Sequence, residues 1–213
     1  MMAIPDLLMK LSKPEFDELR AQSYSAVEMA IILSRPLDTV RMRCRRLGIR
    51  PTVKVEGATQ LRYGIVQGRD LVADMRLSER GVSIPEVKFF MDNYSKKGPY
   101  SKGGFGAEQV PFNERMNGTH LLILPKGDEP KIHFFENSDW SWTDLVQGLN
   151  MANCRWGAVG LGNCAFEFLE RAYCWKNSID YDQMVRQRQK AAVNRFSQLL
   201  TEARREKQLA DTK

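Results

Sequence analysis

Basic side chains gather between residues 35 and 54, and they are the first feature of the chain that points to a function. Against a single acid, Asp38, this stretch holds Arg35, Arg41, Arg43, Arg45, Arg46, Arg50 and Lys54. Surface helices usually alternate charges of opposite sign, because like charges at helical spacing repel each other. Clustered guanidinium groups instead suit a polyanion, since arginine bonds both phosphate oxygens and the guanine edge. The pattern favours nucleic-acid binding, with a structural or protein-binding helix as the alternative.

Three short helices are expected to position these arginines. Serine followed three residues later by glutamate is a capping box, and two such boxes predict helices over about 14–22 and 26–33: Ser12 with Glu15, and Ser25 with Glu28. Ser34-Arg35-Pro36 ends the second helix, and proline is tolerated where a third helix begins. In that third helix, residues at three- and four-residue spacing form an apolar stripe: Leu37, Val40, Cys44 and Leu47. Gly48 then supplies a C-terminal cap.

The side of the third helix opposite this stripe is the predicted DNA-reading face. A major groove about 12 Å wide accepts one helix. We expect Arg45 and Met42 to read bases, and the neighbouring arginines to contact phosphates, which position a helix without specifying sequence. The full set of predicted DNA contacts is Arg35, Asp38, Thr39, Arg41, Met42, Arg43, Arg45, Arg46, Arg50, Lys96, Lys97 and Lys102.

The stretch from Glu28 to Ile49, EMAIILSRPLDTVRMRCRRLGI, resembles the Myb-like helix-turn-helix modules of bacteriophage regulators and of GcrA-type cell-cycle regulators. Those modules typically read Glu-Ile-Ala-x-x-Leu-Gly-Arg-Ser, then four residues, then a basic helix ending Arg-Arg-Leu-Gly-Leu. The positions that fit are Glu28, Met29, Ala30, Leu33, Arg35, Val40, Arg45, Arg46, Leu47, Gly48 and Ile49. Ser34 stands in place of the turn glycine, and Pro36 in place of the cap serine. The resemblance covers only the N-terminal part of the chain and implies a DNA-binding regulator of a phage or other mobile element.

Beyond a patternless linker over 50–62, helical periodicity resumes. Residues 69–94 predict a helix pair, with Ser83 and Glu86 as a third capping box, and this pair is either a second helix-turn-helix or a scaffold. The loop YSKKGPYSKGGFG follows, whose lysines suit phosphate, although such loops are also ordinary linkers. THLLILP and KIHFFE predict a β-hairpin. Further helices are expected near 140–149, over about 165–175 and over 181–209.

The expected fold is mainly α with a small β-hairpin (α+β). It comprises a helix-turn-helix domain over 1–54, a mostly helical domain over 63–180 and a long basic amphipathic helix over 181–213. The long helix has an apolar seam, formed by Val185, Ala192, Phe196, Leu199 and Ala203. We expect this seam to join two copies into a homodimer, with packing on its own domain and contact with DNA as the alternatives.

Metal and catalytic chemistry find little support in the residue types. The four cysteines, Cys44, Cys154, Cys164 and Cys174, include no close pair of the kind that zinc sites usually need. We interpret them as buried apolar side chains and expect no cofactor. His120 and His133 fall on the two strands of the hairpin, without the clustered acids that a metal nuclease needs. The chain is therefore not expected to be an enzyme, and a nuclease is the least favoured reading.

Composition is consistent with a cytoplasmic globular protein. The 213 residues carry a net charge of +6, and no apolar run approaches the ~20 residues that span a bilayer. The first ten residues lack the pattern of a signal peptide. We expect a sequence-specific transcriptional regulator whose partners are double-stranded DNA, a second copy, and RNA polymerase or another protein, with no membrane. The alternative is an accessory protein for DNA packaging, replication or recombination that assembles on a partner without controlling a promoter.

Overall fold

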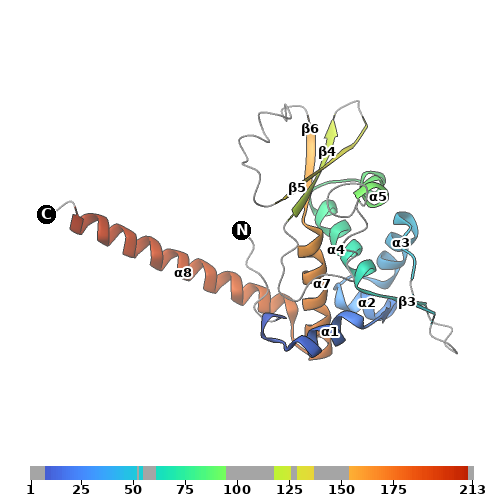
Figure 1. Ribbon diagram of the computed structural model, residues 1–213, viewed down its shortest axis with the longest axis horizontal. Coiled ribbons are helices and arrows are strands. Elements are labelled where there is room, and N and C mark those ends of the chain that lie inside the picture. Colours follow the sequence, from blue (N-terminus) through green and yellow to red (C-terminus); the bar gives the residue numbers. More distant parts are fainter. Residues whose placement is uncertain are drawn as a thin grey trace. The chain divides into compact units, whose positions relative to one another are not determined.

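The computed structural model describes residues 8–51, 53–54, 61–94, 118–125, 129–136 and 154–210, and it divides into two compact units, Met1–Tyr173 and Cys174–Lys213 (Figure 1). As predicted, the described chain is mainly α with small β elements. The helices are η1 Leu8–Lys10, α1 Lys13–Ala21, α2 Ala26–Ile32, α3 Leu37–Leu47, α4 Ile65–Glu79, α5 Ile84–Asn93, α7 Leu161–Lys176 and α8 Tyr181–Ala210. The strands are β1 Tyr24–Ser25, β2 Val53–Lys54, β3 Leu61–Tyr63, β4 Gly118–Pro125, β5 Lys131–Glu136 and β6 Cys154–Val159.

The N-terminal helices α1, α2 and α3 are accompanied by a small antiparallel sheet of β1, β2 and β3. The elements follow in the order α1-β1-α2-α3-β2-β3, and the strands lie in the order β1-β3-β2. The expected linker over 50–62 was therefore wrong for 53–54 and 61–63. Strands of two and three residues are too short to show an alternating pattern. β3 is a strand because it pairs with β1 on one side and with β2 on the other.

Three helices begin at the serines that the sequence indicated. In each capping box the serine backbone N–H donates to the glutamate carboxylate three residues on: Ser12 to Glu15 at 2.8 Å, Ser25 to Glu28 at 2.6 Å and Ser83 to Glu86 at 2.7 Å. The boxes are local, because both partners lie within one turn, so sequence alone predicts them. α4 begins four residues before its predicted start, since the Gln67 side chain accepts a hydrogen bond from the Gly64 N–H at 2.9 Å and caps the helix there.

α4 is the helix on which the first unit packs. Leu71, Val72 and Leu77 are buried, and α5 and β6 pack against the helix. The part of α7 in this unit lies beside α4 (Figure 1). A Cβ placed on Gly68 would lie 2.4 Å from the Phe168 ring, so the two helices approach more closely than alanine at this position allows. Glycine inside a helix is locally unfavourable, and this close approach is what requires it.

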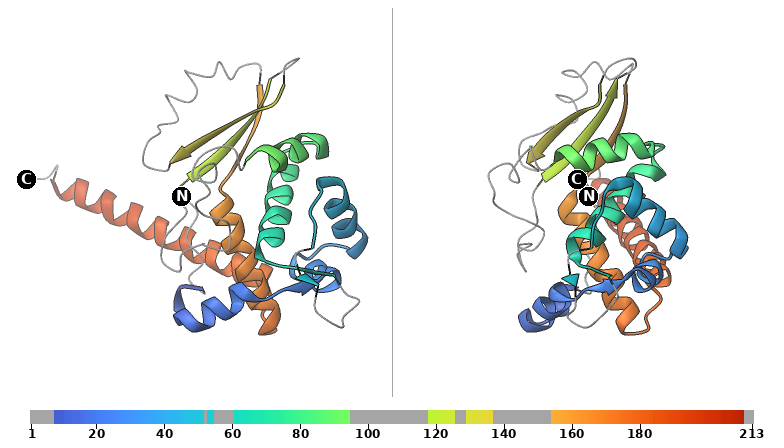
Figure 2. Two further views of the ribbon diagram at one scale, coloured as in Figure 1. Left: turned by 45° about the vertical axis from the view of Figure 1, so that its right-hand side comes forward. Right: turned by 90° about the vertical axis from the view of Figure 1, so that its right-hand side faces the viewer.

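The helix-turn-helix shares its core with α7. Phe16 of α1 meets Phe166 with ring centroids 6.1 Å apart, and Tyr24 of β1 meets Phe168 edge-on at 5.7 Å. α3 packs against α5 as well as against α2, as Figure 2 also shows. The predicted division between residues 54 and 63 is therefore not a boundary between the compact units. Periodicity along the sequence does not reveal contacts between segments this far apart.

The second sheet is antiparallel in the order β5-β4-β6. The predicted hairpin is present as β4 and β5, whereas β6 was not predicted. A Cβ placed on Gly157 of β6 would lie 2.7 Å from Leu77 Cδ2, so this strand also lies very close to α4. After Gly160, β6 leads into α7, which starts four residues before the predicted helix. The helix expected near 140–149 lies outside the described residues.

The second unit holds the end of α7 and the long helix α8, whose bounds agree with the predicted 181–209. Within this unit the Cys174 Sγ lies 3.9 Å from the Met184 Sδ. Large apolar side chains of α8 are exposed: Val193 by 63%, Phe196 by 62%, Leu199 by 54% and Leu200 by 44%. Among the described residues, no helix combines the length and the apolar character needed to cross a membrane.

The close crossing of α4 and α7 generates a stability prediction. Gly68→Ala is expected to lower the free energy of unfolding by about 1–3 kcal/mol, because the new methyl group overlaps the Phe168 ring. At an uncrowded helix position the same change stabilises by ~1 kcal/mol, so the sign of the effect is diagnostic. Urea denaturation measures it. Adding Phe168→Leu is expected to destabilise less than the sum of the two single changes, and a Gly68→Ala variant as stable as wild type would contradict the close approach.

Candidate nucleic-acid interface

The turn between α2 and α3 depends on one left-handed residue. Ser34 has φ of 51°, in the region that favours glycine. Beyond it, the Arg35 N–H donates to the Ala30 carbonyl at 2.9 Å, the hydrogen bond of a Schellman motif. Ser34 therefore adopts the conformation that the glycine of Myb-like modules adopts most easily. The turn sets the direction in which α3 leaves α2.

α3 buries three of the four residues of the predicted stripe, leaves Leu37 half-buried and exposes the opposite face. Val40, Cys44 and Leu47 are buried, and so is Ala30 of α2, the small residue expected where the two helices cross. Thr39 and Met42 are half-buried. The exposed residues on and just after α3 that the sequence singled out are Asp38, Arg41, Arg45, Arg46 and Arg50. The structure thus brings most of the predicted DNA contacts of α3 onto one accessible side.

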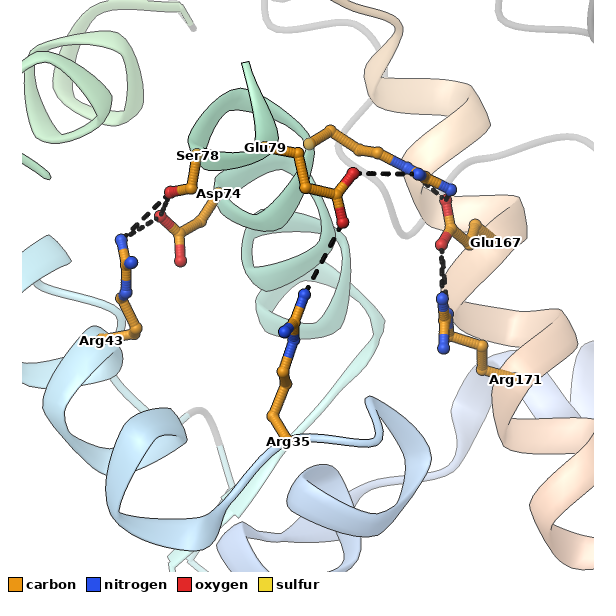
Figure 3. A network of polar contacts seen from close by, with 8 residues as sticks. Arg35, Arg43, Asp74, Ser78, Glu79, Glu167 and Arg171 are labelled. Carbon is orange, nitrogen blue, oxygen red and sulfur yellow. Dashed lines mark hydrogen bonds and ion pairs between the residues drawn. The ribbon is translucent and has the colours of Figure 1, made fainter. Parts of the chain in front are cut away.

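Arg43 does not belong to that group. Its Nη1 lies 2.9 Å from Oδ1 of Asp74 on α4 and donates to the Ser78 Oγ at 3.2 Å (Figure 3). The Asp74 side chain is only 4% exposed and that of Arg43 is 23% exposed. A guanidinium committed to a buried carboxylate is not available to a phosphate. Arg43 therefore anchors α3 to α4, a function that the sequence did not indicate.

Arg35 begins a longer series of ionic contacts from the turn to α7 (Figure 3). Its Nη2 lies 3.6 Å from Glu79, which accepts a hydrogen bond from Arg76 at 3.2 Å. Arg76 in turn pairs with Glu167 of α7 at 2.8 Å, and Glu167 pairs with Arg171 at 3.0 Å. Exposed ion pairs of this length contribute little to stability. Arg35, unlike Arg43, can therefore turn towards a phosphate at small cost.

Arg62 of β3 is a positioning residue that the sequence analysis missed. Its Nε donates to the Ser23 carbonyl at 3.2 Å, and its Nη2 lies 3.5 Å from Glu28. Glu28 also accepts the Ser25 N–H that starts α2. The Glu28 carboxylate thus both caps α2 and pairs with Arg62 of β3. Only the cap leaves a signal in the sequence, because its partners are three residues apart.

The helix pair predicted over 69–94 is present as α4 and α5, joined at Gly81 with φ of 77°. Its second helix does not resemble a DNA reader. Lys88, the basic residue of α5, pairs with Asp92 at 2.9 Å. A Cβ placed on Gly48 would lie 3.8 Å from the Lys88 Nζ, so α5 lies beside the end of α3. These contacts favour a scaffold. Lys96, Lys97 and Lys102 lie outside the described residues.

Three of the four cysteines are buried thiols. Cys44, Cys164 and Cys174 are all buried, and the side chain of Cys154 lies outside the described part. Burial raises the pKa of Cys44 to about 11 and the pKa of Cys164 to about 12, so both remain protonated at neutral pH. Among the described residues, no group of three or more His, Cys, Asp or Glu side chains is placed to hold a metal ion. The register pairs His120 with Phe134 and His133 with Leu121, so the two histidines are not opposite each other.

Comparison with known proteins adds no relative: no protein-family model matches the chain, and no curated protein is significantly similar to it. The geometry of α3 and of its supports is therefore the basis for assigning a function.

The Arg43–Asp74 pair generates a second prediction. Arg43→Met is expected to lower the free energy of unfolding at pH 7 by about 2–4 kcal/mol, because it leaves the buried Asp74 carboxylate unpaired. The loss is expected to be moderate, since Arg43 itself is only partly buried. Thermal denaturation measures the loss. Arg45→Met is the matched control, since Arg45 is exposed, and it is expected to change stability by less than about 0.5 kcal/mol.

The pH dependence of the same variant gives a further check. Burial raises the pKa of Asp74, and the Arg43 charge opposes that rise. Without Arg43 the pKa rises further, so the folded state binds more protons than the unfolded chain and loses stability as pH rises through the folded pKa. At pH 7 the single variant Arg43→Met is therefore expected to have a lower free energy of unfolding than the double variant that also carries Asp74→Asn. The difference between the two free energies is expected to become smaller as the pH is lowered. A gap that does not change with pH would contradict the ionised state of Asp74.

Proposed function

We propose that the chain binds double-stranded DNA with α3 in the major groove. The observation that supports this most directly is the exposed basic side of α3, where Arg41, Arg45 and Arg46 stand, with Arg50 just beyond. Within the described part of the chain, Arg45, Arg46 and Arg50 form no ion pair. The contact of Arg41 with Asp38 spans 4.0 Å, the limit for an ion pair. These cations are therefore available to an external polyanion.

The arginines of the scaffold make the contrast clear. Arg62 pairs with Glu28, Arg69 with Asp70 at 2.7 Å, and Arg76 and Arg171 both pair with Glu167. These charges, like that of Arg43, are neutralised by carboxylates of the protein, whereas those of Arg45 and Arg46 on α3 are not. A distribution of this kind favours a partner rich in phosphate over a general solubility function for the arginines.

We infer that the protein acts as a sequence-specific transcriptional regulator, of the phage or mobile-element type that the resemblance to Myb-like modules suggests. The winged arrangement of α2, α3 and the β2–β3 hairpin supports binding to a duplex, and the mixed chemistry of Asp38, Met42 and Arg45 supports reading of bases. Selection of bound sequences from a random duplex pool tests this function. Sequence-independent binding with higher-order assembly would favour a DNA-packaging, replication or recombination accessory, and metal-dependent cleavage a nuclease.

We further propose that α8 joins two copies of the chain. Ala192, Phe196, Leu199 and Ala203 follow one another at spacings of four, three and four, the repeat by which two helices interlock. Phe196 and Leu199 are exposed in the single chain, together with the neighbouring Val193 and Leu200. A second copy presents the same seam, so the surface is complementary to itself. Paired subunits could place two α3 helices on half-sites ~34 Å apart.

Binding measurements on α3 variants test the DNA interface. Arg46→Ala is expected to weaken binding to specific and random duplexes alike and to lower the salt slope by about one unit, because a phosphate contact is lost. Arg45→Ala is expected to reduce the binding free energy for the preferred duplex by ~1–3 kcal/mol, through the loss of contact with one base pair, and to weaken the preference for guanine at that position. Fluorescence anisotropy over a salt series measures both. Lys131→Ala removes an exposed cation of the second sheet and is the control. Unchanged binding in both α3 variants would exclude α3 as the interface.

Light scattering tests the α8 seam. Phe196→Asp with Leu199→Asp is expected to convert a dimer to a monomer, because both charges enter the apolar seam. Gln187→Asp with Gln198→Asp adds the same charge to exposed positions away from the seam and is expected to leave the dimer intact. Circular dichroism confirms that each variant is folded. A wild-type chain that is monomeric at micromolar concentration would contradict the proposal.

A further inference from the structure

The exposed face of α3 begins with an acid whose side chain lies almost entirely in solvent. The Asp38 side chain is 98% exposed, and the ion pair recorded for it is the 4.0 Å contact with Arg41 Nη1. DNA presents a row of phosphates on both sides of the groove. A carboxylate on a helix that enters this groove opposes binding, so its presence there calls for a compensating contact.

A purely local function for Asp38 is the first alternative. It lies in the first turn of α3, where a negative charge stabilises the helix through the helix dipole. That function does not depend on the face of the helix from which the carboxylate projects. Asp38 nevertheless projects from the side opposite Val40, Cys44 and Leu47, the buried stripe. The face itself therefore indicates more than helix stabilisation.

Asp38, Met42 and Arg45 form one row along this face. At about 100° per residue they leave the helix within about 60° of one another. At a rise of 1.5 Å per residue, Met42 lies about 6 Å and Arg45 about 10.5 Å beyond Asp38 along the axis. Successive base pairs are about 3.4 Å apart, so Asp38 and Arg45 are separated by about three base-pair steps when the helix follows the groove.

The two ends of the row have opposite hydrogen-bonding properties, since Asp38 accepts and Arg45 donates. A carboxylate only accepts hydrogen bonds, and the major-groove donors are the exocyclic amino groups, N4 of cytosine and N6 of adenine. A guanidinium only donates, and it fits the O6 and N7 acceptors of guanine. The Met42 side chain between them offers an apolar contact of the kind that suits the thymine methyl group.

We propose that Asp38 is a specificity-determining residue that selects a base bearing a major-groove amino group, about three base pairs from the guanine that Arg45 reads. The proposal rests on DNA binding through α3 as proposed above. At a matching site the amino group donates to the carboxylate and compensates for its removal from water. At any other site the carboxylate meets acceptors or phosphates and finds no donor, so Asp38 weakens non-specific binding more than specific binding.

Selection from a random duplex pool, carried out with wild type and with Asp38→Asn, tests the proposal. The wild-type pool is expected to show cytosine or adenine at one position about three base pairs from a guanine, and direct competition between duplexes carrying each base distinguishes the two. Asp38→Asn is expected to change preference at that one position towards adenine, which asparagine bonds through N6 and N7. It is also expected to tighten binding to random duplex several-fold at low salt, since a negative charge is lost.

Asp182→Asn is the matched control, because Asp182 also lies in the first turn of a helix, α8. It is expected to leave sequence preference unchanged. If Asp38→Asn keeps the wild-type preference while guanine selection by Arg45 persists, Asp38 is not a reader and DNA binding through α3 stands. If the wild type selects no sequence, or Arg45→Ala changes nothing, sequence reading by α3 fails first and the inference about Asp38 fails with it.

Discussion

The close approach of Phe168 to the backbone of α4 at Gly68 is the constraint on which the first unit depends. The Phe168 side chain is fully buried, and its ring also meets Tyr24 of β1. One aromatic ring therefore contacts both the central helix and the strand that leads into the helix-turn-helix. Glycine at position 68 costs local helix stability, but it allows this packing. α3 in turn lies against α4 in a defined orientation, with Arg43 facing Asp74.

That orientation decides which arginines are free. With α3 beside α4, Arg43 faces Asp74 and Ser78 and becomes part of the interior. Removing an ion pair from water is costly, and a good geometry with additional hydrogen bonds is needed to offset the cost. The three-way contact of Arg43, Asp74 and Ser78 provides such a geometry. Arg45, two residues later, points to solvent. Residues of one type in one helix thus divide into an anchor and a proposed DNA contact according to the face they occupy.

The proposed reading face of α3 combines charges of both signs, so that affinity for any duplex and preference for one sequence would depend on different side chains. Arginines attract any duplex, because phosphates dominate the long-range field. A carboxylate in the same row weakens that attraction everywhere except where a base offers a donor. Since α3 is held by Arg43 on one flank and by the left-handed turn at Ser34 at its start, its side chains are presented on a preorganised helix. Preorganisation reduces the entropy lost on binding.

The sequence by itself determined the features whose partners lie within a turn or two of each other. The capping boxes at Ser12, Ser25 and Ser83, the buried stripe of α3, the β4–β5 hairpin and the length of α8 all follow from local spacing, and the structure contains them. The tertiary structure decided the rest. Whether Arg43 contacts Asp74 or solvent, whether 53–54 and 61–63 are strands, and whether 154–159 pairs with β4 depend on residues far apart in the chain. Periodicity reports which face of an element is buried, but not what covers it. For that reason α3 and its buried side could be located from sequence, while the division of its arginines could not.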